Sequence, residues 1–243
     1  MLIDLSNKVA IITGAGTGIG RAIAELLSSQ GVSVALIGRR KDKLESSQEV
    51  LKGKQSLVIG CDVTDRDSVA HMVEKVSSQF GTPSILINNA GYNTRPRQTI
   101  DISYQSWDLT LDINLTGTFN CVRAVLPLMR EIEEGTIVNI SSIAGKTPTV
   151  IAGVAYSASK HGVVSLTGSI NDEESRNGIR ATVICPGETE TDILDQRPEP
   201  VSKQRRLEML QPEDVAEAVS LAVSLPKRAC LREIIIKPRI AYL

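Results

Sequence analysis

Short segments rich in Val and Ile alternate with longer amphipathic segments along the 243-residue chain, and this alternation constrains the fold most strongly. Runs such as VAII and TVIC are apolar on both sides, as strands covered by helices on both faces require. The segments that we predict as strands are 8–13, 32–38, 56–63, 84–91, 136–142, 178–187 and 232–238. The sequence therefore predicts an α/β fold, a doubly wound, seven-stranded parallel sheet of the Rossmann type flanked by helices on both faces.

No linker, repeat or low-complexity tract interrupts this pattern, so residues 1–243 are expected to form one domain. Hydrophobic residues make up 42% of the chain, which is enough for a packed core. Residues 188–210 are polar and contain prolines, and we expect them to form a mobile lid over a substrate.

The overall composition argues against several classes of function. A net charge of −1 and an aromatic content of 3% give no attraction to nucleic acid or anionic membranes and no base-stacking surface. The chain has no apolar run of about 18 residues and no signal-peptide pattern, so a cytoplasmic protein is expected. The 2 histidines and 4 cysteines are too scattered for a metal site, and the thiols are expected to be free.

A glycine-rich segment, TGAGTGIG, follows the first predicted strand at residues 13–20. Glycines let the backbone approach a pyrophosphate closely, and the N-terminus of the following helix attracts its negative charge. The residues expected to contact a dinucleotide here are Gly14, Thr17, Gly18, Ile19 and Gly20. The alternative is a plain tight turn between a strand and a helix.

The second predicted strand ends in LIGRRK, which bears on the choice of cofactor. Sites for NAD(H) usually carry an acid at this point, but here Gly38 occupies that position and Arg39 and Arg40 follow. Arginine pairs well with a 2′-phosphate, so NADP(H) is predicted over NAD(H). The alternative is a solvated basic start to a helix.

The third predicted strand closes in CDVTD. Asp62 is expected to reach an adenine amino group, with Val63 against the ring. For Asp65, in the same segment, a role only as the N-cap of the next helix is the second interpretation.

The segment YSASK places Tyr156 and Lys160 four positions apart. On a helix this spacing puts both polar heads on one face. A buried tyrosine with a chance basic neighbour is the alternative.

Taken together, these segments resemble the short-chain dehydrogenase/reductase family. NNAG (88–91), the asparagine of LDINLTGTF, ISS (140–142) and CPG (185–187) complete its motifs in order, from about residue 7 to 192. The resemblance implies reversible hydride transfer between nicotinamide and a carbonyl or secondary alcohol, with Asn114, Ser142, Tyr156 and Lys160 as the catalytic residues.

The resemblance also implies a role for each catalytic residue. Tyr156 would exchange the proton, and its pKa, ordinarily near ~10, is expected to fall because of Lys160 and the charged nicotinamide. Lys160 would also bind the nicotinamide ribose. Ser142 would orient the substrate oxygen, with Ser141 as the competing choice. Asn114 would hold a water chain to Lys160, or be an ordinary asparagine inside the predicted helix from about 114 to 131.

Further positions are assigned by the same resemblance. The other cofactor-lining residues are expected to be Asn89, Ala90, Gly91, Pro186, Gly187, Thr189 and Thr191, together with Tyr156 and Lys160. Substrate contacts are expected from 92–99, 143–155 and 188–206. Arg95 and Arg97 either meet a carboxylate or an acyl-carrier phosphate, or belong to a solvated loop. Glu188 departs from the apolar residue typical of the family.

The C-terminal segment LPKRACLREIIIKPR resembles NADP-dependent 3-hydroxy acid and serine dehydrogenases more than 3-oxoacyl-acyl-carrier-protein reductases. A 3-hydroxy or 3-oxo acid is therefore the expected substrate, with acyl-carrier or CoA thioesters as alternatives. Family members also suggest a homotetramer or homodimer. A non-catalytic NADP(H)-binding sensor or scaffold on the same fold is the competing function.

Overall fold

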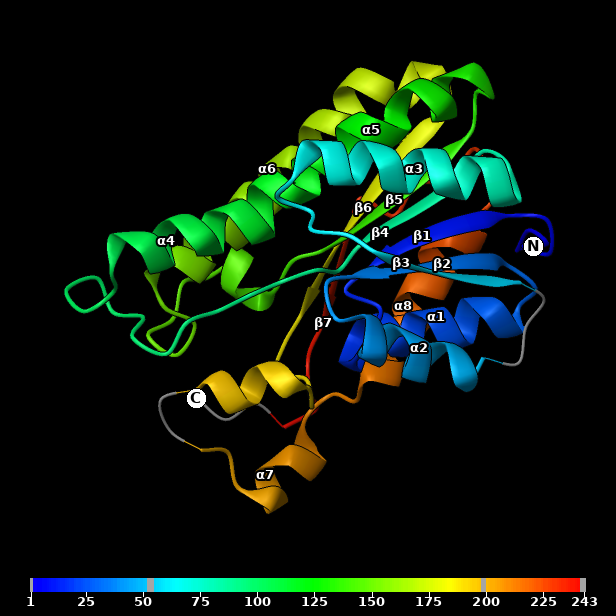
Figure 1. Ribbon diagram of the computed structural model, residues 1–243. Helices are drawn as coiled ribbons and strands as arrows, with labels where there is room; N and C mark the ends of the chain where they lie inside the picture. The colour runs from blue at the N-terminus through cyan, green and yellow to red at the C-terminus, as the bar shows by residue number, and fades with distance from the viewer. Residues whose placement is uncertain (1, 52–54, 198–199, 241–243) are drawn as a thin grey trace.

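The computed structural model describes residues 2–51, 55–197 and 200–240. Within them, parallel strands form one sheet of seven in the order β3-β2-β1-β4-β5-β6-β7 (Figure 1). The strands are β1 (Val9–Thr13), β2 (Ser33–Gly38), β3 (Ser56–Gly60), β4 (Ile85–Asn88), β5 (Gly135–Ile140), β6 (Ile179–Pro186) and β7 (Glu233–Ile236). The order reverses between β1 and β4, and ligands of doubly wound sheets bind at such a point.

Helices cover both faces of the sheet, as predicted. Alternate residues of β1 enter different cores, with Ala10 and Ile12 in one and Val9 and Ile11 in the other. The first core is closed by α1 (Gly18–Ser29), α2 (Lys41–Glu49) and α8 (Pro212–Ser224). The second is closed by α3 (Arg66–Phe80), α5 (Gly117–Glu131) and α6 (Val154–Glu174), on the opposite side of the sheet in Figure 1. The prediction of a doubly wound α/β fold is confirmed.

Five strands end earlier than the sequence predicts, β6 and β7 by one and two residues and the other three by more consequential shifts. β3 ends at Gly60, β4 at Asn88 and β5 at Ile140, so residues 61–63, 89–91 and 141–142 leave the sheet. Asn, Asp and Gly at these positions are depleted in strands, and the residues line the space beyond the carboxyl ends of the strands. The predicted site residues therefore lie on loops that the sheet positions.

The helix predicted from about residue 114 begins earlier. α4 (Tyr104–Leu111), a π-helical turn (Asp112–Thr116) and α5 follow one another without a break. The Ser103 side chain caps α4 by accepting from the Ser106 amide at 3.0 Å. The wide turn falls on Asn114, and such turns occur frequently at functional sites.

The segment predicted as a lid lies beyond the carboxyl end of β6 (Figure 1). It contains the 3-10 helix η4 (Asp192–Gln196) and α7 (Lys203–Glu208). Its two ends are joined, because the Glu190 amide donates to the Leu210 carbonyl at 2.8 Å and the Leu210 amide donates to the Glu188 carbonyl at 3.0 Å. Residues 198–199 lie outside the described residues. None of the helices in the described ranges is long and apolar enough to cross a membrane.

Candidate active site

A cavity of about 1130 Å³ opens at the carboxyl ends of the strands. Of the predicted site residues, those that line it are Gly14, Thr17, Gly18, Ile19, Arg39, Arg40, Asp62, Val63, Asn89, Ala90, Gly91, Ser142, Tyr156, Lys160, Pro186, Gly187, Thr189 and Thr191. Gly20 and Asn114 do not line it. The volume slightly exceeds that of ordinary small-molecule pockets, so it suits a dinucleotide and a small substrate together.

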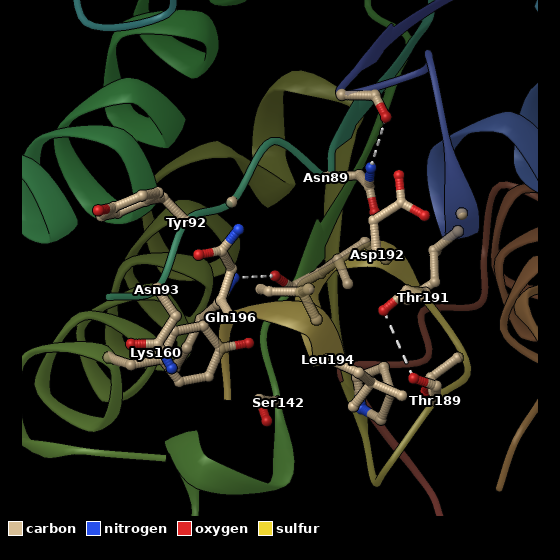
Figure 2. Close-up of a pocket in the computed structure, with 18 of the residues that line it drawn as sticks. Asn89, Tyr92, Asn93, Ser142, Lys160, Thr189, Thr191, Asp192, Leu194 and Gln196 are labelled. Carbon is tan, nitrogen blue, oxygen red and sulfur yellow. Dashed lines mark hydrogen bonds between the residues drawn. The ribbon is translucent and has the colours of Figure 1, made fainter. Parts of the chain in front are cut away.

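The glycine turn at one end of the cavity depends on its glycines. Gly14 and Gly18 have φ angles of 65° and 51°, which residues with side chains rarely adopt. The buried Thr13 hydroxyl accepts from the amides of Asn89 and Ala90, each at 3.0 Å. The Asn89 side chain also donates to the Gly14 carbonyl at 3.2 Å. Asn89 thus braces the turn as well as lining the cavity (Figure 2).

Gly20 acts through packing rather than through contact with the cavity. A Cβ atom at this position would lie 2.3 Å from the Gly14 oxygen and 2.5 Å from Asn89 Nδ2. The absence of a side chain lets α1 approach the turn closely, as the last glycine of dinucleotide-binding turns does. The structure places Gly20 outside the cavity lining, and its predicted contact with a dinucleotide stays a prediction.

Basic side chains border the cavity beside the end of β2. Arg39 and Arg40 are exposed there, and Lys43 of α2 joins them. Lys43 is not among the residues predicted from the sequence. Its position three residues after Arg40 is the signal that could have found it, because that spacing places residues on one helix face. A Cβ atom on Gly16 would lie 3.0 Å from the Lys43 Cβ, so this lysine sits against the glycine turn.

Asp62 and Asp65 have different tasks. Asp62 accepts from the Thr64 amide at 3.0 Å and the Thr64 hydroxyl at 2.8 Å. Burial alone would raise the pKa of Asp62, but these hydrogen bonds and the charge of Arg39 lower it. Asp65 caps α3 by accepting from the amides of Asp67 and Ser68, which confirms the second interpretation of this residue.

Tyr156 and Lys160 share one face of α6, as their spacing predicts. The Lys160 ammonium lies over the Tyr156 ring, 5.5 Å from its centroid. The Lys160 side chain is buried and its Nζ donates to the Ile140 carbonyl at 2.8 Å. The end of β5 and the first turns of α6 thus fix the pair together at the cavity wall.

The pKa values of the pair differ from the expectation. Burial raises the pKa of Tyr156, while the nearby Ser142 hydroxyl and the Arg97 charge act in the opposite direction. Burial lowers the pKa of Lys160 to about 8. The expected fall in the phenol pKa does not occur in the protein alone, because desolvation outweighs the neighbouring charges. It is expected only when a positively charged nicotinamide adds to them.

A stability measurement tests the buried state of Lys160. Its pKa falls from 10.5 to about 8, so below about pH 8 the folded protein buries a charged amine. Between these pH values the folded protein has lost this proton and the unfolded chain retains it, so the free energy of unfolding rises with pH. We expect Lys160→Met to lose this rise.

The measurement is urea denaturation of parent and variant at about pH 7 and about pH 10. The difference in unfolding free energy, variant minus parent, should decrease by up to a few kcal/mol, at about 1.4 kcal/mol per pKa unit. If the difference in unfolding free energy between variant and parent were equal at both pH values, burial would not lower the pKa of Lys160.

The two serines after β5 differ in the groups that they contact. Ser141 is 3% exposed, and its hydroxyl donates to the Lys160 carbonyl at 2.9 Å. Ser142 is half-buried, its Oγ accepts from the Ala144 amide at 3.1 Å, and its hydroxyl faces the phenol of Tyr156. Ser141 therefore anchors α6, and the contacts support Ser142 as the residue that meets a substrate.

Asn114 is fully buried behind the cavity. Its Oδ1 accepts from the Tyr92 amide at 2.8 Å, and its Nδ2 donates to the Tyr92 carbonyl and the Ser159 hydroxyl, each at 3.0 Å. Ser159 in turn donates to the Tyr156 carbonyl at 2.8 Å. Both amide hydrogens are used within the protein, so a water could bond to the Asn114 side chain only by donating to Oδ1. Its predicted place in a water chain stays a prediction.

The substrate end of the cavity is formed by the three segments that the sequence singled out. Tyr92, Asn93, Ile151 and Gln196 line it, together with Arg97. Figure 2 shows Asn93 and Gln196 near Lys160, on the side away from Asn89. The sequence gives Arg95 and Arg97 the same two alternatives. In the structure Arg97 is buried and lines the cavity, whereas Arg95 is exposed and does not line it.

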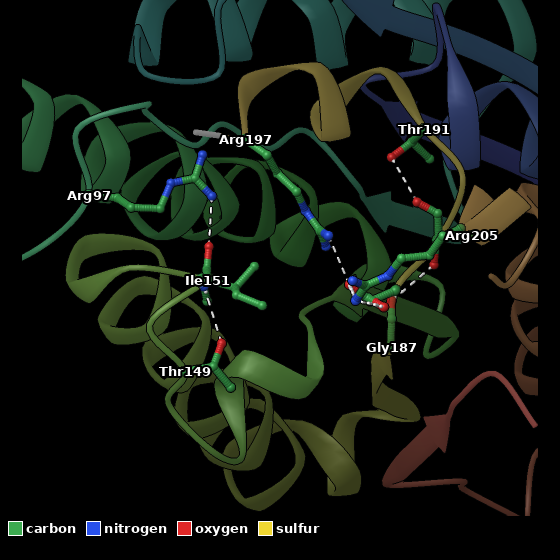
Figure 3. Close-up of polar contacts among 10 residues, drawn as sticks. Arg97, Thr149, Ile151, Gly187, Thr191, Arg197 and Arg205 are labelled. Atoms are coloured by element: carbon green, nitrogen blue, oxygen red, sulfur yellow. Dashed lines mark hydrogen bonds and ion pairs between the residues drawn. The ribbon is translucent and has the colours of Figure 1, made fainter. Parts of the chain in front are cut away.

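Glu188, which departs from the family pattern, is an ion-pair centre. It contacts Arg197 at 2.8 Å and Arg205 at 2.9 Å (Figure 3). Burial would raise the pKa of Glu188, but its bonds to Arg205 and Arg197 lower it. The carboxylate thus joins the first residue of the 188–210 segment to Arg197 and to Arg205 of α7.

Comparisons with known proteins extend over nearly the whole chain. The family model described as short chain dehydrogenase matches residues 8–201. An uncharacterized oxidoreductase of Staphylococcus aureus (strain MRSA252) is 36% identical over 234 residues, which are 96% of this chain and 98% of the relative.

Two solved structures are similar over a comparable length. A metagenomic short-chain oxidoreductase in complex with NADP is 30% identical, with a TM-score of 0.84 and coverage of 98% of this chain and 100% of that chain. The closed form of serine dehydrogenase complexed with NADP+ is 28% identical, with a TM-score of 0.87 and coverage of 96% of each chain. The glycine turn and the helix of Tyr156 both lie within the residues that the family model matches.

Proposed function

Because the chain belongs to the short-chain dehydrogenase family of oxidoreductases, we propose that it transfers hydride reversibly between NADP(H) and a carbonyl or secondary alcohol. One observation carries the proposal. The glycine turn and the polar groups of Ser142, Tyr156 and Lys160 line one and the same cavity. A cofactor bound at the turn can therefore reach a substrate that contacts Tyr156.

The protein's own residues have distinct tasks in this reaction. The Tyr156 phenol gives its proton to the substrate oxygen during reduction and takes it back during oxidation. The Ser142 hydroxyl donates a hydrogen bond to the same oxygen and stabilises the charge that develops there. Lys160 favours the phenolate through its charge and holds the nicotinamide ribose. Asn114 positions the turn at Tyr92 and, through Ser159, the first turns of α6.

The choice of NADP(H) over NAD(H) rests on charge. Gly38 stands where an acid would repel a 2′-phosphate, and Arg39, Arg40 and Lys43 border the cavity at this point. The positive φ angles of Gly14 and Gly18 give the backbone the close approach that a pyrophosphate needs. The metagenomic oxidoreductase and serine dehydrogenase, both similar in fold, are complexed with NADP and NADP+.

The substrate proposed is a small 3-hydroxy or 3-oxo acid, with acyl-carrier or CoA thioesters as the alternative. The similarity to serine dehydrogenase supports the acid. We further propose that residues 1–243 form one domain, that 188–210 close over the substrate, and that the protein assembles as a homotetramer or homodimer. Size-exclusion chromatography with light scattering tests the assembly.

The proposal is tested by NADPH oxidation with a panel of ketones, aldehydes, 3-oxo acids and 3-oxoacyl thioesters. Turnover with at least one class is expected, and kcat/KM should be higher with NADPH than with NADH. Arg39→Asp should lower kcat/KM for NADPH by about 10- to 100-fold, because a charge-assisted bond to the phosphate is lost and a repulsive charge is gained.

The outcomes separate the alternatives. Equal use of both cofactors by the parent protein would contradict the cofactor choice alone. Tight NADPH binding without turnover of any compound would favour the non-catalytic sensor instead. Lys41→Asp is the matched control, because Lys41 is exposed and forms an ion pair with Glu45 rather than lining the cavity.

A further inference from the structure

Arg97 is built into the wall of the cavity beside the first turn of α6. It is only 5% exposed, and it lines the cavity. The Val154 amide donates to the Arg97 carbonyl at 3.1 Å. Gly153 has a φ angle of 83°, and a Cβ atom there would lie 2.5 Å from the Arg97 Cβ. Arg97 is thus fixed against the helix turn that carries Tyr156.

The guanidinium of Arg97 is held by backbone carbonyls from three segments. Nε donates to Thr94 at 2.8 Å, Nη1 to Ile151 at 2.8 Å and Nη2 to Gln196 at 2.5 Å (Figure 3 shows the contact with Ile151). A guanidinium has about five N–H donors, so one on each terminal nitrogen remains after these three bonds. These contacts hold the guanidinium in place and leave two of its N–H groups without a hydrogen bond to the described residues.

The positive charge of Arg97 has no negative partner in the part of the chain that the structure describes. Its contacts there are carbonyl groups, and no carboxylate forms an ion pair with it. Carbonyl dipoles stabilise a buried cation but do not neutralise it, and an unpaired buried charge is costly. The neighbouring Arg197 and Arg205 differ, because both are paired with Glu188.

We propose that Arg97 binds the carboxylate of a short oxo or hydroxy acid through its two remaining donors and so selects anionic substrates. This inference rests on the proposed function and names the substrate class of the same site. Val150 and Ile151 also line the cavity, although both are exposed, and they offer apolar contact to the carbon chain.

The position of Arg97 favours a carboxylate on the reacting molecule over the phosphate of an acyl carrier. Arg97 and Tyr156 line the same cavity, and the Arg97 carbonyl accepts from the amide of Val154 in the first turn of the helix that carries Tyr156. A carrier phosphate lies at the far end of a long flexible arm from the reacting carbonyl. A carboxylate on the reacting molecule itself would carry its charge into the part of the cavity that Arg97 and Tyr156 share, and arginine forms bidentate bonds with carboxylates.

The test compares acetoacetate with methyl acetoacetate, which differ in the charged group, as substrates with NADPH. The parent should prefer the acid by about 10- to 100-fold in kcat/KM, mainly through KM. In Arg97→Gln the ratio of kcat/KM for the acid to kcat/KM for the ester should fall to about 1, and Arg97→Lys should recover part of the parental ratio. Arg95→Gln is the matched control from the same loop, and its preference should be parental.

The other outcomes separate a failure of the role proposed for Arg97 from a failure of the proposed function. A parent that reduces the ester as well as the acid overturns the role of Arg97 and leaves the oxidoreductase proposal standing. A parent that reduces no compound of the wider panel contradicts the proposed function instead. The carboxylate subsite is then tested by calorimetry of malonate binding to the NADPH-loaded protein. Malonate binding by the parent and by Arg95→Gln supports the carboxylate subsite, and absence of malonate binding overturns it.

The malonate titration also covers a failure of the Arg97 variants to fold. In that case competitive inhibition of the parent by malonate, but not by dimethyl malonate, supports the subsite. Equal inhibition by both compounds, or by neither, contradicts it.

Discussion

Tyr156→Phe is expected to bind NADPH as the parent does and to lose turnover by about 100- to 10,000-fold, the usual contribution of a general acid. The substitution keeps the ring under the Lys160 ammonium and removes the hydroxyl that faces Ser142. Tyr156 is the one tyrosine of α6, so no second phenol of this helix replaces the lost proton donor. Single-turnover NADPH oxidation and fluorescence titration of NADPH separate the chemical step from binding.

The control for this variant is Tyr104→Phe, which removes a phenol of the same kind from a side chain that is 88% exposed. Its turnover should be parental. Rates for Tyr156→Phe within a few-fold of the parent would remove this tyrosine from the mechanism. Loss of NADPH binding would instead show that the phenol helps to hold the cofactor.

The layered fold could be predicted because its signals are local. Val- and Ile-rich runs specify doubly covered strands, and the amphipathic segments between them specify the helices, without knowledge of distant contacts. The shared face of Tyr156 and Lys160 follows from helical spacing alone. The capping role of Asp65 is local for the same reason, because it depends on the amides of the next few residues.

Other features depend on contacts between distant segments, and the sequence could not supply them. The separation of Arg97 from Arg95 is set by carbonyls of Ile151 and Gln196, which lie far along the chain. The raised pKa of Tyr156 is set by burial, which spacing does not measure. The packing role of Gly20 likewise depends on how closely α1 approaches the glycine turn.

Gly20→Ala is expected to weaken NADPH binding by more than about 10-fold and to lower the free energy of unfolding by about 1–3 kcal/mol. The new Cβ would lie 2.3 Å from the Gly14 oxygen, which is a backbone atom and cannot move without shifting the turn. Asn89 Nδ2, at 2.5 Å, would lose its bracing bonds to the turn as it moves away. Calorimetric titration of NADPH and urea denaturation measure the two effects.

Gly60→Ala is the matched control, because the same methyl group added at the end of β3 meets no atom within 4 Å. Replacing a strand glycine by alanine removes backbone entropy from the unfolded chain, so stability should be unchanged or higher by up to about 1 kcal/mol. The opposite signs of the two glycine substitutions distinguish a steric effect at the turn from a general response to alanine. If Gly20→Ala bound NADPH with parental affinity, close packing of α1 against the turn could not be what shapes the phosphate end of the cavity.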